Sequence, residues 1–85
     1  MIIINKEVND MNLHTVPLGE EVKIINLQQV DSLLYKRLNA FGIKEGCQVC
    51  LLQKGWFSGA CVIECQGQKI GLRKKDLLNI KVEEI

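Results

Sequence analysis

Apolar and polar positions along most of this chain follow the pattern of short β-strands. The segment 22–27 is rich in apolar, β-branched side chains, and it follows a turn predicted at Pro17-Leu18-Gly19-Glu20. The alternation skips a position at Ile24-Ile25, which predicts a bulge or a strand buried on both faces. Further strands are predicted over residues 46–53, 60–66, 69–73 and 80–82, with a loop over 54–59 and a tight turn at Gly67-Gln68.

One segment has helical periodicity instead. Asp31 or Ser32 is expected to cap a helix that runs to about Phe41, with Gly42 ending it in the left-handed conformation. At about 100° per residue, one apolar stripe collects Val30, Leu34, Leu38 and Phe41, with Leu33 on its flank. Tyr35, Lys36 and Asn39 lie on the opposite side. Arg37 falls inside the apolar arc, where an unpaired charge is costly, so its guanidinium is expected to cap backbone carbonyls or to pair with Asp76 or Glu64.

Five short strands with one α-helix inserted after the first predict a mainly-β fold. The expected architecture is a small five- to six-stranded barrel, closed so that long edges are not left exposed. Residues 75–79 are expected to form a short helical turn before the last strand. Residues 1–10 are assigned to an N-terminal appendage and residues 11–85 to a single domain.

Composition narrows the class of protein. The 85 residues are 47% hydrophobic and 25% charged, which is typical of one small globular domain. A formal charge of +1 disfavours a general nucleic-acid binder. The longest apolar run, Met1 to Ile4, is too short to span a bilayer and no secretory signal is seen, so we expect a cytoplasmic protein without membrane insertion. The isoleucines of this run make self-association worth testing.

Four cysteines suggest a metal site at first sight. Cys47-x2-Cys50 and Cys61-x3-Cys65 have spacings that a structural zinc site could use. In regular strands, however, Cys47, Cys61 and Cys65 turn inward together while Cys50 faces the other way. We therefore expect buried free thiols and no cofactor, and keep a small zinc-thiolate structural or sensing protein as the alternative.

The sequence shows no catalytic constellation. Phosphate-loop, dinucleotide-binding and HExxH motifs are missing, and His14 is 33 residues from the nearest cysteine. Binding is the better hypothesis. Trp56-Phe57, in a glycine-flanked loop, are candidate apolar anchors. Arg73-Lys74-Lys75 form a candidate basic rim, and Arg37 is a further candidate contact.

Three stretches resemble one known family. Residues 37–49, RLNAFGIKEGCQV, resemble the RL-x-x-Φ-G-[IL]-x-x-G-x-x-[VI] segment of the ferrous iron transport protein A (FeoA) family. Ile70-Gly71-Leu72-Arg73, with Asp76 and residues 80–82, resembles its closing I-A-L-R…I-x-V stretch, and Leu18-Gly19-Glu20 matches its opening. The loop at 55–59 and the four cysteines depart from the family pattern.

The resemblance implies an SH3-like barrel and no enzymatic activity. It also implies a cytoplasmic accessory protein of bacterial ferrous iron uptake, which binds the GTP-dependent ferrous iron transporter FeoB. We expect Trp56 and Phe57 to anchor that contact, with Arg37, Arg73, Lys74 and Lys75 around them.

Overall fold

The computed structural model describes residues 11–55 and 60–85. Within them the elements are β1 (Glu21–Asn26), α1 (Ser32–Ala40), β2 (Gln48–Gln53), β3 (Ala60–Cys65), β4 (Gln68–Arg73), α2 (Lys74–Leu78) and β5 (Lys81–Glu84). This is the expected order of strands with a helix after the first. The predictions for residues 1–10, and for Trp56 and Phe57, lie outside the described residues.

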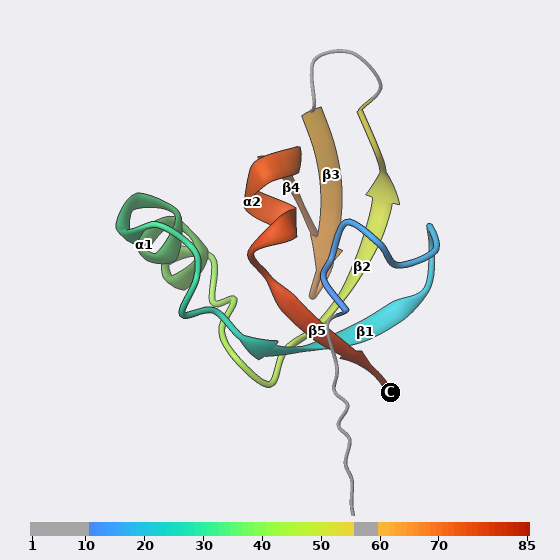
Figure 1. Ribbon diagram of the computed structural model, residues 1–85, viewed down its shortest axis with the longest axis horizontal. Helices are drawn as coiled ribbons and strands as arrows, with labels where there is room; N and C mark the ends of the chain where they lie inside the picture. Colours follow the sequence, from blue (N-terminus) through green and yellow to red (C-terminus); the bar gives the residue numbers. More distant parts are fainter. Residues whose placement is uncertain (1–10, 56–59) are drawn as a thin grey trace, which may run out of the picture.

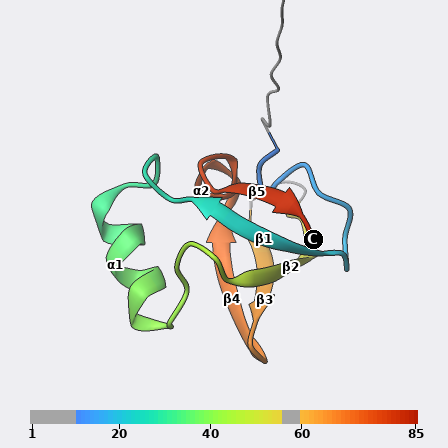
Figure 2. The ribbon, with the colours of Figure 1, turned by 90° about the horizontal axis from the view of Figure 1, so that it is seen from below.

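The strands form one antiparallel sheet in the order β4-β3-β2-β1-β5. The β3–β4 hairpin runs steeply across β1 and β5 in both views, so the sheet is strongly bent (Figures 1 and 2). The register shifts between Ile24 and Asn26 where β1 pairs with β5, which confirms the bulge predicted from the skipped alternation. A second shift lies between Leu51 and Gln53, where β2 pairs with β3.

The chain before β1 runs along the outer side of β5. Asn12 forms an isolated antiparallel bridge with Lys81, the amide of Leu13 donates to the carbonyl of Ile80, and the amide of Val82 donates to the carbonyl of Met11. Leu13 and Val16 are fully buried as a result. The described chain therefore has five strands, with this bridged segment beside the last of them.

Turns and caps follow the local sequence closely. Gly19 has φ +83°, and the amide of Glu20 donates to the carbonyl of Pro17, which confirms the turn predicted there. Asp31 caps α1 by accepting from the amide of Leu34 at 2.8 Å, and Gly42 leaves the helix with φ +79°. The β3–β4 turn was predicted one residue too late. Its central residues are Gln66 and Gly67, both with positive φ, as a type I′ hairpin turn requires.

The core lies inside the bent sheet and is aliphatic. Its largest fully buried side chains are Leu13, Ile24, Leu27, Leu38, Ile43, Leu51, Ile63, Leu77 and Ile80. Only Leu34 and Leu38 of α1 are buried. Phe41, predicted to belong to the same stripe, is instead the helix C-cap and is 38% exposed, because the chain leaves the helix there. The helix thus contacts the core through two leucines and stands at the side of the sheet (Figure 1).

Candidate partner-binding surface

Arg37 lies on the exposed side of α1 and not inside an apolar arc. Its Nη2 atom donates a hydrogen bond to the carbonyl of Gly71 on β4 at 3.3 Å. Of the partners considered from the sequence, the backbone carbonyl is the one that the structure shows. The apolar arc predicted from the periodicity was too wide, because α1 contacts the core only through Leu34 and Leu38. Arg37 therefore joins the helix to β4 while it remains open to solvent.

Arg73 is held at the start of α2 by Asp76. The backbone amide of Arg73 donates to Oδ2 of Asp76 at 3.0 Å, and the Arg73 Nε atom lies 3.7 Å from the same oxygen. The Asp76 side chain is 7% exposed, whereas the Arg73 side chain is 66% exposed. One buried carboxylate thus fixes the backbone at this corner and orients a guanidinium that still faces solvent.

The two arginines line one groove, although 36 positions separate Arg37 from Arg73 in the chain. This arginine groove has a volume of about 440 Å³ and is lined by Asp31, Leu33, Leu34, Arg37, Arg73 and Asp76. A smaller depression beside it, about 210 Å³, shares both arginines and Asp76. Lys74 and Lys75 are exposed on α2, next to Arg73. The structure therefore brings Arg37 together with the predicted basic run.

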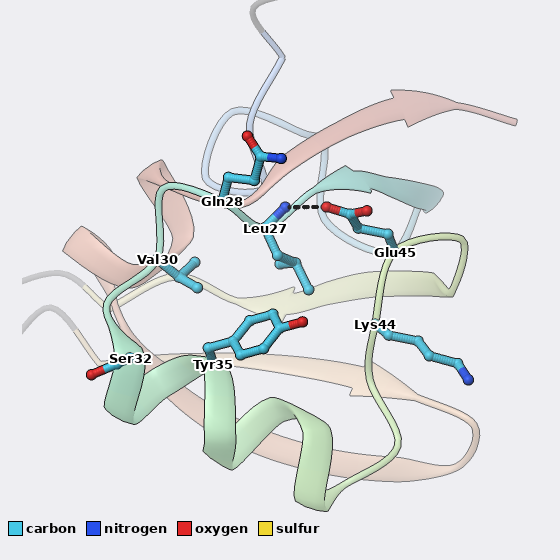
Figure 3. A pocket seen from close by; sticks show the side chains of 7 residues that line it. All are labelled: Leu27, Gln28, Val30, Ser32, Tyr35, Lys44 and Glu45. Atoms are coloured by element: carbon cyan, nitrogen blue, oxygen red, sulfur yellow. Dashed lines mark hydrogen bonds between the residues drawn. The ribbon is translucent and has the colours of Figure 1, made fainter.

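A second groove lies on the other side of α1 and was not predicted from the sequence. It measures about 670 Å³ and is lined by Leu27, Gln28, Val30, Ser32, Tyr35, Lys44 and Glu45. The Tyr35 ring extends from the helix toward Leu27, and the Glu45 Oε2 atom accepts from the amide of Leu27 at 3.0 Å (Figure 3). The sequence signal that could have revealed this tyrosine groove is Tyr35, an aromatic residue on the polar side of the predicted helix.

Between the two grooves, α1 presents apolar side chains to solvent. Leu33 is 78% exposed and lines the arginine groove, and Tyr35 is 47% exposed and lines the tyrosine groove. Because the two side chains lie on opposite sides of the helix, a partner that covers both would contact both flanks of α1. Trp56 and Phe57, the anchors predicted from the sequence, lie outside the described residues.

The cysteines do not assemble a metal site in the part of the chain that the structure describes. No group of three or more His, Cys, Asp or Glu side chains there is arranged to hold a metal ion. Cys50, Cys61 and Cys65 are buried, and Cys47 is half-buried. Burial, reinforced by the carboxylates of Glu21 and Glu64, raises the pKa of the Cys50 thiol. Cys50 packs on the face of β2 opposite to Val49 and Leu51, as the strand period predicts.

Among the described residues, no helix is long and apolar enough to cross a bilayer.

Comparison with known proteins identifies the family. A model of the FeoA domain matches residues 11–84. The chain belongs to the FeoA domain family. No curated protein sequence matches it.

Solved structures show the same SH3-like fold. The iron(II) transport protein A from Clostridium thermocellum is 25% identical, with a TM-score of 0.76 over 88% of this chain and 46% of that one. The FeoA protein from Chlorobium tepidum is 17% identical, with a TM-score of 0.80 over 88% of this chain and 70% of that one. The manganese regulator SloR is 23% identical, with a TM-score of 0.71 over 87% of this chain and 34% of that one. The chain thus spans about half of the first of these relatives and a third of the regulator.

Proposed function

We propose that this protein is a cytoplasmic accessory protein of ferrous iron uptake that binds the cytosolic part of the GTP-dependent ferrous iron transporter FeoB. Membership of the FeoA domain family supports the pathway. The observation that carries the binding role is the exposure of Leu33 and Tyr35 on α1, between two grooves. The helix lies at the side of the sheet, where a partner can reach both of its flanks (Figure 2).

Charge and shape on this surface suit a partner segment with apolar and acidic residues. Leu33 and Tyr35 would bury apolar area, while Arg37 and Arg73 would receive carboxylates at the edge of the contact. Both guanidiniums are already positioned, Arg37 by the Gly71 carbonyl and Arg73 by Asp76. Binding therefore costs little additional side-chain order, which favours these arginines over flexible lysines.

The test is binding of the purified chain to the detergent-solubilised transporter, followed by isothermal calorimetry with Tyr35→Ala and with Arg37→Ala/Arg73→Ala. We expect each to weaken binding by at least about tenfold, because aromatic and arginine side chains dominate interface energies. Leu18→Ala is the matched control, since Leu18 is 57% exposed. It belongs to the turn that leads into β1, at the end of that strand away from α1 (Figure 1). Equal affinity of all variants would reject α1 as the binding element, and no binding by the wild type would reject the partner.

Trp56 and Phe57, outside the described residues, stay in the proposal as apolar anchors predicted from the sequence. Trp56→Ala and Phe57→Ala are measured in the same assay. If they reduce affinity while Tyr35→Ala does not, the loop and not α1 carries the contact.

A further inference from the structure

Two of the four cysteines come together through the pairing of β2 with β3. The register pairs Cys50 with Glu64 and Leu51 with Ile63, so its continuation places Cys65 opposite Val49. Cys47 lies two residues before Val49 and therefore on the same inner face, diagonally across from Cys65. Cys65 belongs to the buried core, and Cys47 packs against that core. The Cys47 side chain lies near enough to Cys65 to contribute, after burial, to the raised pKa of the Cys65 thiol.

The backbone around Cys47 is held in place on both sides. Its carbonyl accepts from the amide of Ile24 at 2.9 Å, and the preceding amide, of Gly46, donates to the carbonyl of Ile24 at 2.7 Å. Cys47 thus lies directly before β2, with its backbone fixed against β1.

The two thiols differ in a way that orders their chemistry. Cys47 is half-buried, and its sulfur accepts from the backbone amide of Lys44 at 3.5 Å and donates to the carbonyl of Gly42 at 3.6 Å. Cys65 is 2% exposed, and burial together with the nearby Cys47 raises the pKa of its thiol. An oxidant from solvent therefore reaches Cys47 first, and Cys65 is the neighbour that can react next.

The other cysteines are placed away from this pair. Cys50 lies on the opposite face of β2. Cys61 shares a face with Cys65 but stands four residues earlier on β3, about 13 Å along the strand. Neither is in a position to compete for Cys47.

We infer that Cys47 and Cys65 form an oxidation site, a dithiol that a peroxide converts to an intramolecular disulfide. The Cys47 thiolate attacks one peroxide oxygen; the S–O bond forms, the O–O bond breaks, and the leaving hydroxide takes up a proton to become water. The Cys65 thiolate then attacks the sulfur of the Cys47 sulfenic acid, forming the S–S bond and releasing the oxygen as a second water. Overall, two thiols and one peroxide give one disulfide and two waters.

The experiment treats the purified, reduced chain with a stoichiometric amount of hydrogen peroxide and follows its intact mass without reductant. We expect the loss of two hydrogen atoms in a monomer, restored by dithiothreitol. Cleavage after lysine and glutamate separates Cys65, in peptide 65–69, from Cys61, in peptide 55–64. The disulfide is expected to join peptide 65–69 to peptide 46–54, and Cys50→Ser leaves Cys47 as the cysteine in the latter.

Matched variants identify the order of the two steps. Cys50→Ser and Cys61→Ser are expected to keep the disulfide, whereas Cys47→Ser and Cys65→Ser are expected to lose it. In Cys65→Ser, the Cys47 sulfenic acid should accumulate and be labelled by dimedone. A disulfide that survives Cys65→Ser, or one that forms only between two molecules, would overturn the inference.

A measurement on the unaltered chain guards against variants that fail to fold. Iodoacetamide on the native reduced protein is expected to alkylate Cys47 first, and the alkylated protein should no longer lose two hydrogen atoms to peroxide. Loss of the hydrogens after Cys47 is blocked would show that the site lies elsewhere.

Discussion

At the scale of single residues, Asp76 shows how one buried charge organises a corner of the fold. It is 6% exposed, and its Oδ2 atom serves both the amide and the guanidinium of Arg73. Removing such an acceptor leaves a backbone donor without its partner at the start of α2. The sequence placed Asp76 among possible partners of Arg37, but tertiary packing assigns it to Arg73.

We expect Asp76→Ala to lower the free energy of unfolding by about 2 kcal/mol, because the helix loses its cap and the buried donor its acceptor. Urea unfolding followed by circular dichroism measures the change. Glu83→Ala is the matched control. Glu83 pairs with Lys23 at 3.3 Å, but both side chains are more than 40% exposed, and such pairs contribute about 0–1 kcal/mol. Equal losses in the two variants would contradict the structural role given to Asp76.

At the scale of elements, the β3–β4 hairpin carries a local strain. Gln66 is the one non-glycine residue with positive φ in the described chain, at 55°, and Gly67 follows at 81°. Two-residue turns with both central residues left-handed favour Asn-Gly, because asparagine tolerates this conformation better than other side chains.

Gln66→Asn should therefore stabilise the protein, by about 0.5 kcal/mol, and raise the urea midpoint with an unchanged slope. The same substitution at Gln48, an exposed position in β2, should give no gain, since asparagine is disfavoured in strands. A gain at Gln48 equal to that at Gln66 would assign the effect to composition and not to the turn.

At the scale of the whole molecule, the pKa of His14 depends on residues that are distant in the chain. Its pKa is lowered from 6.5, first by burial and then by the positive charges of Lys54 and Lys74. Those lysines lie 40 and 60 positions further along the chain. The unfolded chain lacks this environment, so below about pH 6.5 it binds a proton that the folded state resists. The contribution to stability is complete above that pH and declines as the pH falls toward the folded pKa.

The expected outcome is a fall in the free energy of unfolding between about pH 7 and pH 5.5 that is shallower in His14→Gln than in the wild type. Urea titrations at several pH values in this window give both slopes. Parallel curves for the two proteins would contradict the lowered pKa of His14.

The sequence by itself determined the local features of this protein. The strand positions and the left-handed exit at Gly42 followed from it, and it narrowed the helix cap to Asp31 or Ser32 and the irregularity in β1 to a bulge or a doubly buried strand. Each of these depends on residues within one turn or one strand, where backbone sterics and short hydrogen bonds decide the outcome. The family resemblance rests on the same local signals, and the family match confirms it.

Only the tertiary structure decided which side chains face a neighbour and which face solvent. The nine-residue helix α1 reaches the core with Leu34 and Leu38 alone, so Leu33 and Phe41 stay exposed, and Arg37 reaches β4 instead of an interior partner. The meeting of Arg37 with Arg73, and of Cys47 with Cys65, likewise comes from contacts between separate elements. Periodicity describes one element at a time, whereas packing selects the part of each face that is covered.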